Sequence, residues 1–395
     1  MSERLKRFLS SLPLHIIVIA MAVIWLLPTL GLLVTSLRPV QDANTSGWWT
    51  VFSAPAAGVE YVEYCASCHG PEGDAIAAAD FSNPEYVALF RRSVQLAATF
   101  NNTLPDGSIH VPEDQRPDAQ QLADILTQIR GFAGVEERPR FTLSNYVDAL
   151  VGYRGQTSYE QDCAAGTQSS ELTCDFVTDL GNSRGMARAF LNTLIVTIPA
   201  TLLPLIFAAL AAYAFSWLHF PGRMWLFALL VGLQIVPLQM TLVPISKLYQ
   251  QLGLSSSFFG VWLFHTGFGL PYAIFLMRNF IGSLPRDLFE SAYLDGASHW
   301  TAFTRLALPL SMPALASLAI FQFLWVWNDL LVALVFLSGR QPVLTYQING
   351  LVQSLGGGWH LLTASAFLSM LLPMLVFFAF QRFFVRGLLS GAVKG

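Results

Sequence analysis

The stretch Glu290-Ser-Ala-Tyr-Leu-Asp-Gly-Ala-Ser298, followed by Leu308-Pro-Leu-Ser-Met-Pro313, is a polar and amphipathic interruption between two strongly apolar segments. Pro285 with Arg286 indicates that a helix begins just before it. Gly296 can supply a turn after this helix that a side chain would obstruct. Helical spacing predicts one apolar face on the helix, formed by Leu288, Phe289, Ala292 and Tyr293.

A second short helix is expected after the turn, with Trp300, Phe303 and Ala307 on one face. Leu308-Pro309 ends this helix and leads the chain back into an apolar segment. A compact helix–turn–helix that projects from a membrane bundle is suited to a groove on a partner protein. The residue pattern alone is almost equally consistent with an interfacial helix that lies on the lipid surface.

The composition indicates that most of the chain lies in membrane lipid. Hydrophobic residues make up 54% of the 395 residues and charged residues only 12%, whereas soluble domains carry about 25% charged residues. We therefore predict an all-α membrane protein with six transmembrane helices. The first helix, within residues 1–45, is longer than the apolar part of a signal peptide, and we interpret it as a retained anchor. Apolar runs of the length that spans a bilayer, ~20 residues, occur at 14–37, 190–217, 224–245, 258–280, 310–337 and 361–385.

Charge and cysteine placement indicate the orientation of the chain. Residues 39–185 hold 20 of the 25 Asp and Glu but only 8 of the 22 Lys and Arg, so an acidic block is inserted in an otherwise basic protein. The basic residues of the short loops fall mainly on the side of the N-terminus, which places both termini in the cytoplasm. The block is then extracytoplasmic, and because all four Cys lie in it, an oxidising compartment is indicated. No nucleic-acid-binding pattern is present.

Two features inside the spans have a structural as well as a functional interpretation. Asn328 and Asp329 lie in an otherwise apolar span, where ionisable groups are expensive. Such groups indicate a functional site by default; the alternative is that they satisfy a helix break or face a partner subunit. Prolines inside or near the spans are equally consistent with a bundle that lines a pathway and moves and with ordinary kinks in a static bundle. These prolines are Pro199, Pro204, Pro237, Pro244, Pro271 and Pro373.

The loop residues resemble those of a known transporter family. Glu290-x-Ala292-x-x-Asp295-Gly296-Ala297, then Leu308-Pro309 and Pro313, is similar to the coupling loop of inner-membrane permeases of binding-protein-dependent ABC importers, with Ser291 in place of the more usual Ala. The resemblance covers the first helix and a five-helix core at 186–395, with the cytoplasmic loop at 284–309. It implies that the loop sits in a cleft of an ATPase subunit. The implied contact residues are Glu290, Ala292, Asp295, Gly296, Leu308 and Pro309.

Further segments resemble carbohydrate-importing members of that family. They are Leu191-Asn-Thr-Leu-Ile-Val-Thr197, Ala211-Ala-Tyr-Ala-Phe215, residues 322–329, and the tail 384–395, which resembles the maltose-type second permease and most of all its alpha-glucoside subgroup. The implied partners are a second permease subunit, an ATPase dimer and a periplasmic sugar-binding protein, at a bacterial inner membrane. The chain contains no Gly-Lys dipeptide and hence no phosphate-binding loop. Any ATP must therefore act through the partner ATPase, and we assign no catalytic residue to this chain.

Tyr64-Cys-Ala-Ser-Cys-His-Gly70, in the acidic block, carries the c-type haem attachment pattern Cys-x-x-Cys-His. Cys65 and Cys68 would form thioethers to haem, and His69 would be an axial ligand of the iron. Residues 57–135 resemble a small, mostly helical c-type cytochrome inserted in the first extracytoplasmic loop, with 119–131 as its closing helix. A reactive dithiol and half of a zinc site are the alternatives, although no second Cys/His pair follows at zinc spacing.

The remaining outer residues concern the sixth iron ligand and a disulfide. No Met occurs between Met21 and Met186, so the usual Met ligand is missing. His110 is a possible second axial ligand; the alternative is an exposed loop histidine beside a five-coordinate haem. In the loop 139–185, Cys163 and Cys174 are expected to form a disulfide, worth roughly 3 kcal/mol for a loop of this size, rather than to remain as two thiols.

These expectations give one leading function and one rival. The leading function is a permease subunit of an ATP-driven carbohydrate importer that carries an extracytoplasmic haem c domain. The rival is a membrane-anchored c-type cytochrome for electron transfer or redox sensing, with the helical bundle as its scaffold. No residue in the sequence establishes a coupling between haem and transport.

Overall fold

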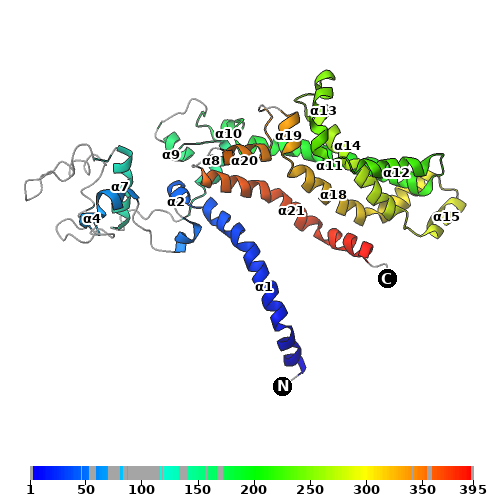
Figure 1. Ribbon diagram of the computed structural model, residues 1–395, viewed down its shortest axis with the longest axis horizontal. Helices are drawn as coiled ribbons and strands as arrows, with labels where there is room; N and C mark the ends of the chain where they lie inside the picture. Colours follow the sequence, from blue (N-terminus) through cyan, green and yellow to red (C-terminus); the bar gives the residue numbers. More distant parts are fainter. Residues whose placement is uncertain are drawn as a thin grey trace, which may run out of the picture. The chain divides into compact units, whose positions relative to one another are not determined.

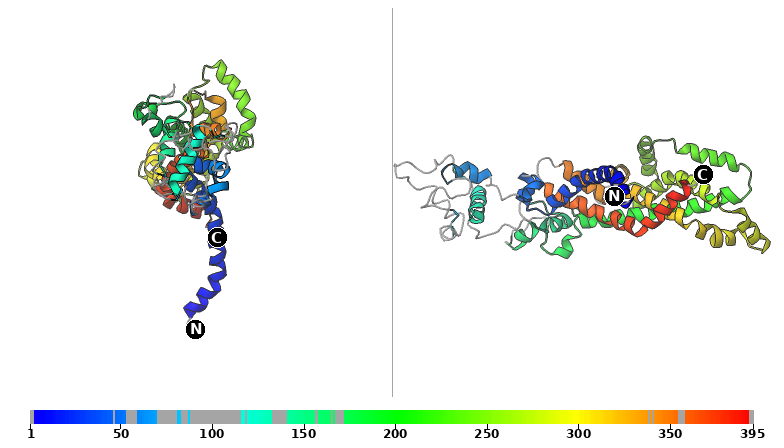
Figure 2. Two further views of the ribbon diagram at one scale, coloured as in Figure 1. Left: turned by 90° about the vertical axis from the view of Figure 1, so that its left-hand side faces the viewer. Right: turned by 90° about the horizontal axis from the view of Figure 1, so that it is seen from below.

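The computed structural model describes residues 3–45, 47–52, 59–69, 81–82, 87, 116–117, 119–132, 141–155, 158–164, 166, 172–337, 339, 341–353 and 358–392. Every regular element in these ranges is a helix, as the sequence predicts (Figure 1; Figure 2). The chain divides into two compact units: residues 1–34 with 41–142, and residues 35–40 with 143–395. The second unit contains the whole segment that resembles a permease core.

The first unit begins with the long apolar helix α1 (Glu3–Ser36). Residues 12–36 of this helix are long and apolar enough to cross a membrane, and only 6% of their most apolar window is buried within the chain. Trp25, for example, is 79% exposed. So much exposed apolar surface requires a cover of lipid or of another subunit. The short helices α2 (Val40–Thr45) and η1 (Trp48–Phe52) follow.

Three short helices form the described part of the insert. They are α3 (Val59–Tyr64), α4 (Ala66–His69) and α7 (Ala119–Phe132). The predicted helix 119–131 is confirmed as α7, and Ile125 and Ile129 of this helix are fully buried. They pack in one cluster with Tyr61, Cys65, Phe81, Val87 and Leu126. This cluster joins the attachment motif to the closing helix of the insert.

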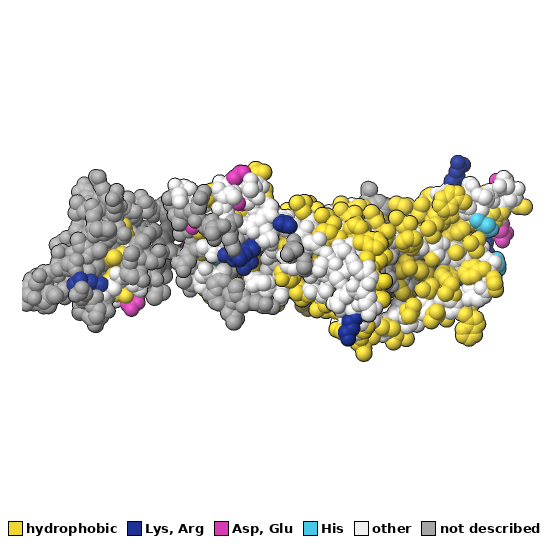
Figure 3. Space-filling view, turned by 90° about the horizontal axis from the view of Figure 1, so that it is seen from above, with side chains coloured by type: hydrophobic (Ala, Val, Ile, Leu, Met, Phe, Trp, Pro, Cys, Tyr) yellow, Lys and Arg dark blue, Asp and Glu magenta, His cyan; other side chains and the backbone are white. Residues whose placement is uncertain are grey.

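Four long helices build the second unit: α11 (Met186–Trp217), α14 (Phe258–Ile281), α18 (Met312–Trp327) and α21 (Trp359–Ala392). α11 and α14 pack closely, because the small side chains of Ala208, Ala212 and Ala273 allow their backbones to approach. Figure 3 shows hydrophobic side chains over most of the visible surface of this bundle. An apolar surface around an apolar core is what a bundle surrounded by lipid requires.

One of the six predicted spans is a bent pair of helices. The segment predicted at 224–245 consists of α12 (Arg223–Leu233) and α13 (Leu238–Gln251), which meet at 100°. Pro237 stands at the junction, where it has no N–H with which to continue the first helix. The chain also bends by 70° where it enters α18. Among the described residues four helices are long and apolar enough to cross a membrane, and six spans result if each bent pair counts as one.

The predicted span 310–337 is not one continuous helix. α18 ends before Asn328, and a separate helix α19 (Leu331–Phe336) follows. Asn328 Nδ2 donates to the carbonyl of Leu324 (2.8 Å), in the last turn of α18. The carboxylate of Asp329 accepts from backbone N–H groups of the first turn of α19, as an N-cap does. This confirms the interpretation that the two polar residues satisfy a helix break.

The described residues of the segment 143–182 form a small lobe of the second unit, which we call the outer lobe after its predicted extracytoplasmic position. It contains α8 (Ser144–Val151), α9 (Tyr159–Ala164) and α10 (Phe176–Asp179). The predicted disulfide between Cys163 and Cys174 is confirmed, and it links α9 to the segment before α10. A further helix of this unit, α20 (Leu344–Gln353), connects α19 to α21 along the chain.

The outer lobe binds the short segment 35–40 of the second unit. Asn145 Nδ2 donates to the carbonyl of Ser36 (2.9 Å) and to that of Arg38 (2.7 Å). The hydroxyls of Ser36 and Tyr146 lie 2.7 Å apart. Asn145 and Ser36 are fully buried, and buried amides that bond two carbonyls fix the backbone strongly. The chain therefore leaves and re-enters the second unit at one place.

Candidate functional site

The coupling loop consists of α15 (Arg286–Leu294), α16 (His299–Ala302), the π-helical turn η4 (Phe303–Ala307) and α17 (Leu308–Leu310). α15 begins directly after Pro285, as the sequence predicts. A Schellman motif closes its C-terminus: Ala297 N donates to Ala292 O (2.9 Å), and Gly296 N donates to Tyr293 O (3.0 Å).

Gly296 is required in this motif for its backbone conformation. Its φ is +82°, in the left-handed region, while a Cβ added to it would meet nothing within 4 Å. Another residue would therefore fit in space but strain the backbone, by roughly 1–2 kcal/mol. Ser298 follows two residues later, and its hydroxyl accepts from Thr301 N (3.2 Å) to begin α16. The predicted turn at Gly296 is confirmed as two adjoining helix caps.

One face of the loop is anchored in the bundle. Phe289 is fully buried and stacks on Trp217, at the end of α11, with ring centroids 3.8 Å apart and an interplanar angle of 24°. Phe303, in the second half of the loop, is buried in the same apolar cluster. Two residues depart from the predicted apolar faces, because Leu288 is 45% and Trp300 66% exposed. The loop packs on the bundle along one edge only, so the bundle covers only part of the apolar face of each loop helix.

The other face of the loop is open to a partner. Leu294, Leu288 and Trp300 leave large apolar surfaces exposed, with Leu294 89% exposed. Figure 3 shows acidic and histidine side chains at the end of the bundle where Figure 1 places α15. Mixed apolar and polar surface of this kind is typical of interaction sites. Of the predicted contact residues, Glu290, Asp295, Gly296 and Pro309 are exposed, and Ala292 and Leu308 are half-buried.

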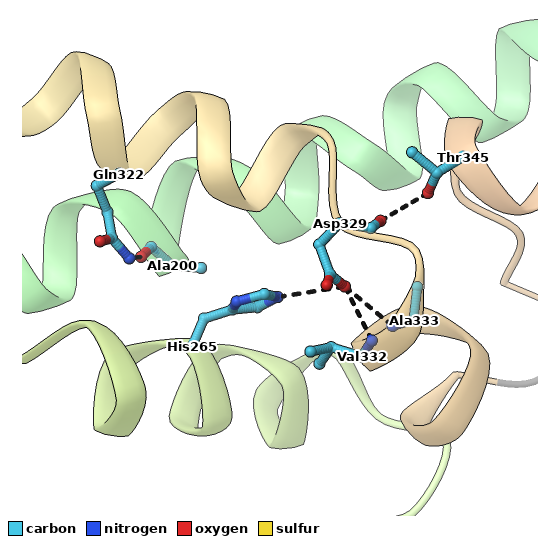
Figure 4. Close-up of polar contacts among 7 residues, drawn as sticks. All are labelled: Ala200, His265, Gln322, Asp329, Val332, Ala333 and Thr345. Carbon is cyan, nitrogen blue, oxygen red and sulfur yellow. Dashed lines mark hydrogen bonds and ion pairs between the residues drawn. The ribbon is translucent and has the colours of Figure 1, made fainter. Parts of the chain in front are cut away.

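A second group of polar side chains surrounds the break between α18 and α19 (Figure 4). Asp329 Oδ2 accepts from Val332 N (3.0 Å) and Ala333 N (3.3 Å). The same oxygen lies 4.0 Å from Nε2 of His265 on α14. The Asp329 carbonyl accepts from Thr345 Oγ1 on α20 (2.7 Å). Asp329 thus links the start of α19 to two other helices.

His265 is a site residue that sequence reasoning missed. It is 1% exposed, and its Nδ1 has no hydrogen-bond partner among the described residues. The sequence signal that could have found it is a histidine inside an apolar span. Gln322, also buried and shown in Figure 4, donates from Nε2 to the carbonyl of Ala200 (3.2 Å). Its partner is a backbone carbonyl of α11, which no sequence pattern specifies.

The cavity beside this polar cluster is too small for a sugar. It measures about 10 Å³ and is lined by residues that include His265, Asp329, Thr193 and Thr345. A cavity of that volume holds about one water molecule. In the conformation described, these side chains therefore tie helices together and do not surround a substrate.

The Cys-x-x-Cys-His motif at 65–69 lies on α4 and the turn before it. His69 N donates to Cys65 O (2.9 Å), so the two side chains project from one face of a helical turn. Both are buried, and the His69 ring stacks on Phe81 with centroids 4.3 Å apart. The side chain of Cys68 and the whole of His110 lie outside the described residues. Within the described ranges, no three His, Cys, Asp or Glu side chains gather as a metal site.

Buried carboxyl groups organise the outer lobe. Asp148 Oδ1 accepts from Tyr159 N (2.8 Å), whereas Oδ2 is buried with no hydrogen-bond partner in the described part of the chain. Burial raises the pKa of the Asp148 carboxyl from 3.8 to about 7, because the charged form loses its water. Burial acts on Asp179 in the same direction, but hydrogen bonds from Thr173 and Tyr159 outweigh it and hold the pKa of Asp179 below its ordinary value.

The sequence matches one family of membrane transport proteins. Residues 186–390 match the family described as the binding-protein-dependent transport system inner membrane component. The chain belongs to this family. It is 40% identical over 395 residues, all of its own length and 95% of the relative's, to an osmoprotective compounds uptake permease protein of Synechocystis sp.. It is 41% identical over 405 residues, 96% of both chains, to an alpha-glucoside transport system permease protein of Rhizobium meliloti.

A solved structure is also similar. The crystal structure of a bacterial ABC transporter involved in the import of the acidic polysaccharide alginate has a chain with 22% identity and a TM-score of 0.44; the similarity covers 60% of this chain and 89% of that one.

Membership in the family settles the class of the protein. The chain is an inner-membrane subunit of a binding-protein-dependent transport system, and it works with a substrate-binding protein, a second permease subunit and ATPase subunits. The matched residues 186–390 correspond to the predicted core at 186–395. The prediction of a transport subunit whose ATPase is a separate partner is confirmed.

Proposed function

We propose that this binding-protein-dependent permease imports alpha-glucosides or related oligosaccharides. The observation that carries the proposal is the 41% identity to an alpha-glucoside permease over 96% of both chains. The sugar-permease-like segments and the tail at 384–395 support the same substrate class. The relative from Synechocystis sp., named for osmoprotective compounds, makes small osmolytes the substrates to test beside the sugars.

In this mechanism the coupling loop transmits the closure of the ATPase dimer. ATP binding brings the ATPase subunits together, and the exposed face around Glu290 and Gly296 moves with them. The buried face around Phe289 carries that movement into the bundle. The bundle then changes from inward-facing to outward-facing, and the binding protein releases sugar at the outer mouth.

The substrate class is tested by uptake into vesicles that contain the complete transporter. Maltose, sucrose and trehalose carry alpha-glucosidic linkages, whereas cellobiose has the same size and a beta linkage. ATP-dependent uptake of the alpha-linked sugars, with little uptake of cellobiose, is expected. Preferential uptake of cellobiose or of a betaine would refute the substrate assignment.

The coupling assignment is tested at Gly296. Gly296→Leu should abolish uptake while the protein remains in the membrane, since the Schellman turn is strained and the docking face is altered. Gly253→Leu is a matched control: Gly253 also has a positive φ of +69° and no atom within 4 Å of an added Cβ, but it lies at the end of α13. Normal uptake with Gly296→Leu would refute the role of the loop.

We also infer that the insert binds haem c covalently. The side chains of Cys65 and His69 share one buried core with Phe81. Stacking on Phe81 holds the imidazole ring in one orientation, which an iron-binding histidine needs. Cys65 and Cys68 would hold the haem through thioethers, and His69 would bind its iron. His110 is the candidate for a second iron ligand, and the alternative is an exposed loop histidine beside a five-coordinate haem. Bound haem would supply one-electron redox chemistry at the outer face.

Covalent attachment is tested by a haem stain after denaturation. The protein, made in a host that matures c-type cytochromes, should keep a haem band that Cys65→Ala with Cys68→Ala abolishes. Cys163→Ser with Cys174→Ser is the control, because it removes the disulfide and should leave the band. Absence of haem in the unaltered protein would refute the inference.

A rival function, a membrane-anchored cytochrome, is separated from transport by the same variants. The buried Cys65–His69 pair is the observation that favours it. If the Cys65→Ala, Cys68→Ala protein imports sugar at the normal rate, transport does not need the haem. If neither protein imports any sugar while the unaltered one carries reducible haem, the rival function replaces the proposed one.

A further inference from the structure

The cytoplasmic end of α11 contacts the coupling loop at two positions one helical turn apart. Tyr213 Oη lies 3.0 Å from Tyr293 Oη, and Trp217 stacks on Phe289. Residues four apart share one face of a helix, so each helix presents both of its partners on a single face. The order of the two pairs is reversed along the chain, and α15 therefore runs antiparallel to the last turn of α11.

Tyr293 also joins the two halves of the loop. Its Oη lies 3.1 Å from Nδ1 of His299, the first residue of α16. A tyrosine hydroxyl has one proton, so Tyr293 donates to one of its two neighbours and accepts from the other. Tyr213 is 5% exposed, and the ring of Phe303 lies edge-on to it with centroids 5.3 Å apart. One hydrogen-bonded chain thus connects α11, α15 and α16.

The connection from the loop to α18 is different in kind. The π-helical turn Phe303–Ala307 interrupts the regular hydrogen bonding, and the chain then bends by 70° at Ser311. Ser311 is fully buried, and its hydroxyl has no hydrogen-bond partner among the described residues. A π-turn followed by a sharp bend interrupts the hydrogen bonding that a continuous helix would keep. The loop is thus joined to α18 along the chain through a break, although Ala314, Leu315 and Leu318 of α18 lie in the same buried cluster as Phe289 and Phe303.

We propose that Tyr213, Tyr293 and His299 form a clamp that fastens the coupling loop to α11, so that a movement of the loop is passed directly to α11. This inference rests on the proposed coupling function of the loop. The Trp217–Phe289 stack supplies packing at the contact, while the clamp fixes the angle between α15 and α16. The three clamp residues are positioning residues, because they act through the loop and contact neither nucleotide nor sugar.

The test is the number of sugar molecules imported for each ATP that the complete reconstituted transporter hydrolyses. Tyr293→Phe keeps the ring and removes both hydrogen bonds, and it should lower this ratio about tenfold, within the range of known coupling effects. Tyr213→Phe removes one bond and should lower the ratio less. Because both act on one chain, the double variant should be no worse than Tyr293→Phe alone. Tyr272→Phe, on an exposed part of α14, is the matched control and should keep the ratio.

A wild-type ratio with Tyr293→Phe would overturn the clamp, as would additive effects in the double variant. If Tyr293→Phe prevents assembly, seen as loss of the ATPase subunits on purification, Tyr213→Phe alone provides the same measurement. Failure of the proposed function has a different signature, because Gly296→Leu would then import sugar normally. An inactive Gly296→Leu protein together with a fully coupled Tyr293→Phe protein refutes the clamp and leaves the role of the loop intact.

Discussion

Replacing Asp148 by Asn should stabilise the outer lobe at pH 8 and remove most of the pH dependence of its stability. The Asn side chain keeps an oxygen that can accept from Tyr159 N, the bond that Asp148 Oδ1 makes at 2.8 Å. It carries no charge, so the buried position that Asp148 Oδ2 occupies without a partner no longer holds an ionised oxygen.

The magnitude follows from the pKa of the Asp148 carboxyl, which burial raises from 3.8 to about 7. Each pKa unit corresponds to about 1.4 kcal/mol, so the full penalty well above pH 7 is on the order of 4 kcal/mol. Because the folded lobe binds the proton more tightly than the unfolded one, the penalty is absent below about pH 4, grows until about pH 7 and then stays constant. The lobe should be about 2–3 kcal/mol more stable at pH 5 than at pH 8.

Amide hydrogen exchange of α8 and α9 in the intact protein measures this difference, after correction for the intrinsic exchange rates. Protection in the unaltered lobe should fall as the pH rises from 5 to 8, and the Asp148→Asn lobe should show little change. Glu160→Gln is the comparison, since Glu160 is an exposed carboxylate in the same lobe. Its charge raises the pKa of Asp148 less than burial does, so this variant should keep most of the pH dependence. Equal stability of the unaltered lobe at both pH values would refute the reasoning from burial.

Three further substitutions test the packing of the second unit. Phe289→Ala should lower the free energy of unfolding by about 3–5 kcal/mol. Leu288→Ala, at an exposed neighbour, should change it by less than about 0.5 kcal/mol. Thermal unfolding of the two variants measures this difference. Asp329→Ala should lower the stability of α19 by about 1 kcal/mol, because the helix loses its cap. Amide hydrogen exchange of the N–H groups at the start of α19 should then be faster, and Asp329→Asn should lower the stability less. Cys163→Ser should lower stability by about 3 kcal/mol, and a reductant should reproduce this loss in the unaltered protein; an unchanged melting temperature with reductant contradicts the disulfide.

Local chemistry made several elements predictable from the sequence. Pro285 and Gly296 mark the start and the end of α15 because a proline suits the entry to a helix and a glycine suits its left-handed C-terminal position. Cys163 and Cys174 lie close together along the chain, in a block that the charge pattern predicts to be extracytoplasmic, so their pairing required no knowledge of the fold. The apolar runs located the membrane segments, since hydropathy depends on composition alone.

Direction and pairing were not predictable in the same way. Hydropathy does not record the path of the chain, so 224–245 was expected as one helix, although α12 and α13 meet at 100°. The contact between His265 and Asp329 depends on two helices that the sequence does not align. The exposure of Leu288 was also not predictable, because the apolar face of a helix is buried only where another element covers it.

The bonds of Asn145 to the carbonyls of Ser36 and Arg38 bear on how such a chain is put together in evolution. They bring residues 35–40 and 143–146 side by side, so the intervening segment is a loop closed at its base by the permease itself. Doubling the length of a closed loop costs only about 0.6 kcal/mol in entropy. The segment between residues 40 and 143 can therefore be lengthened, shortened or exchanged for a foreign domain with little consequence for the helices in the membrane. This makes the pair of segments 35–40 and 143–146 a favourable site for domain insertion.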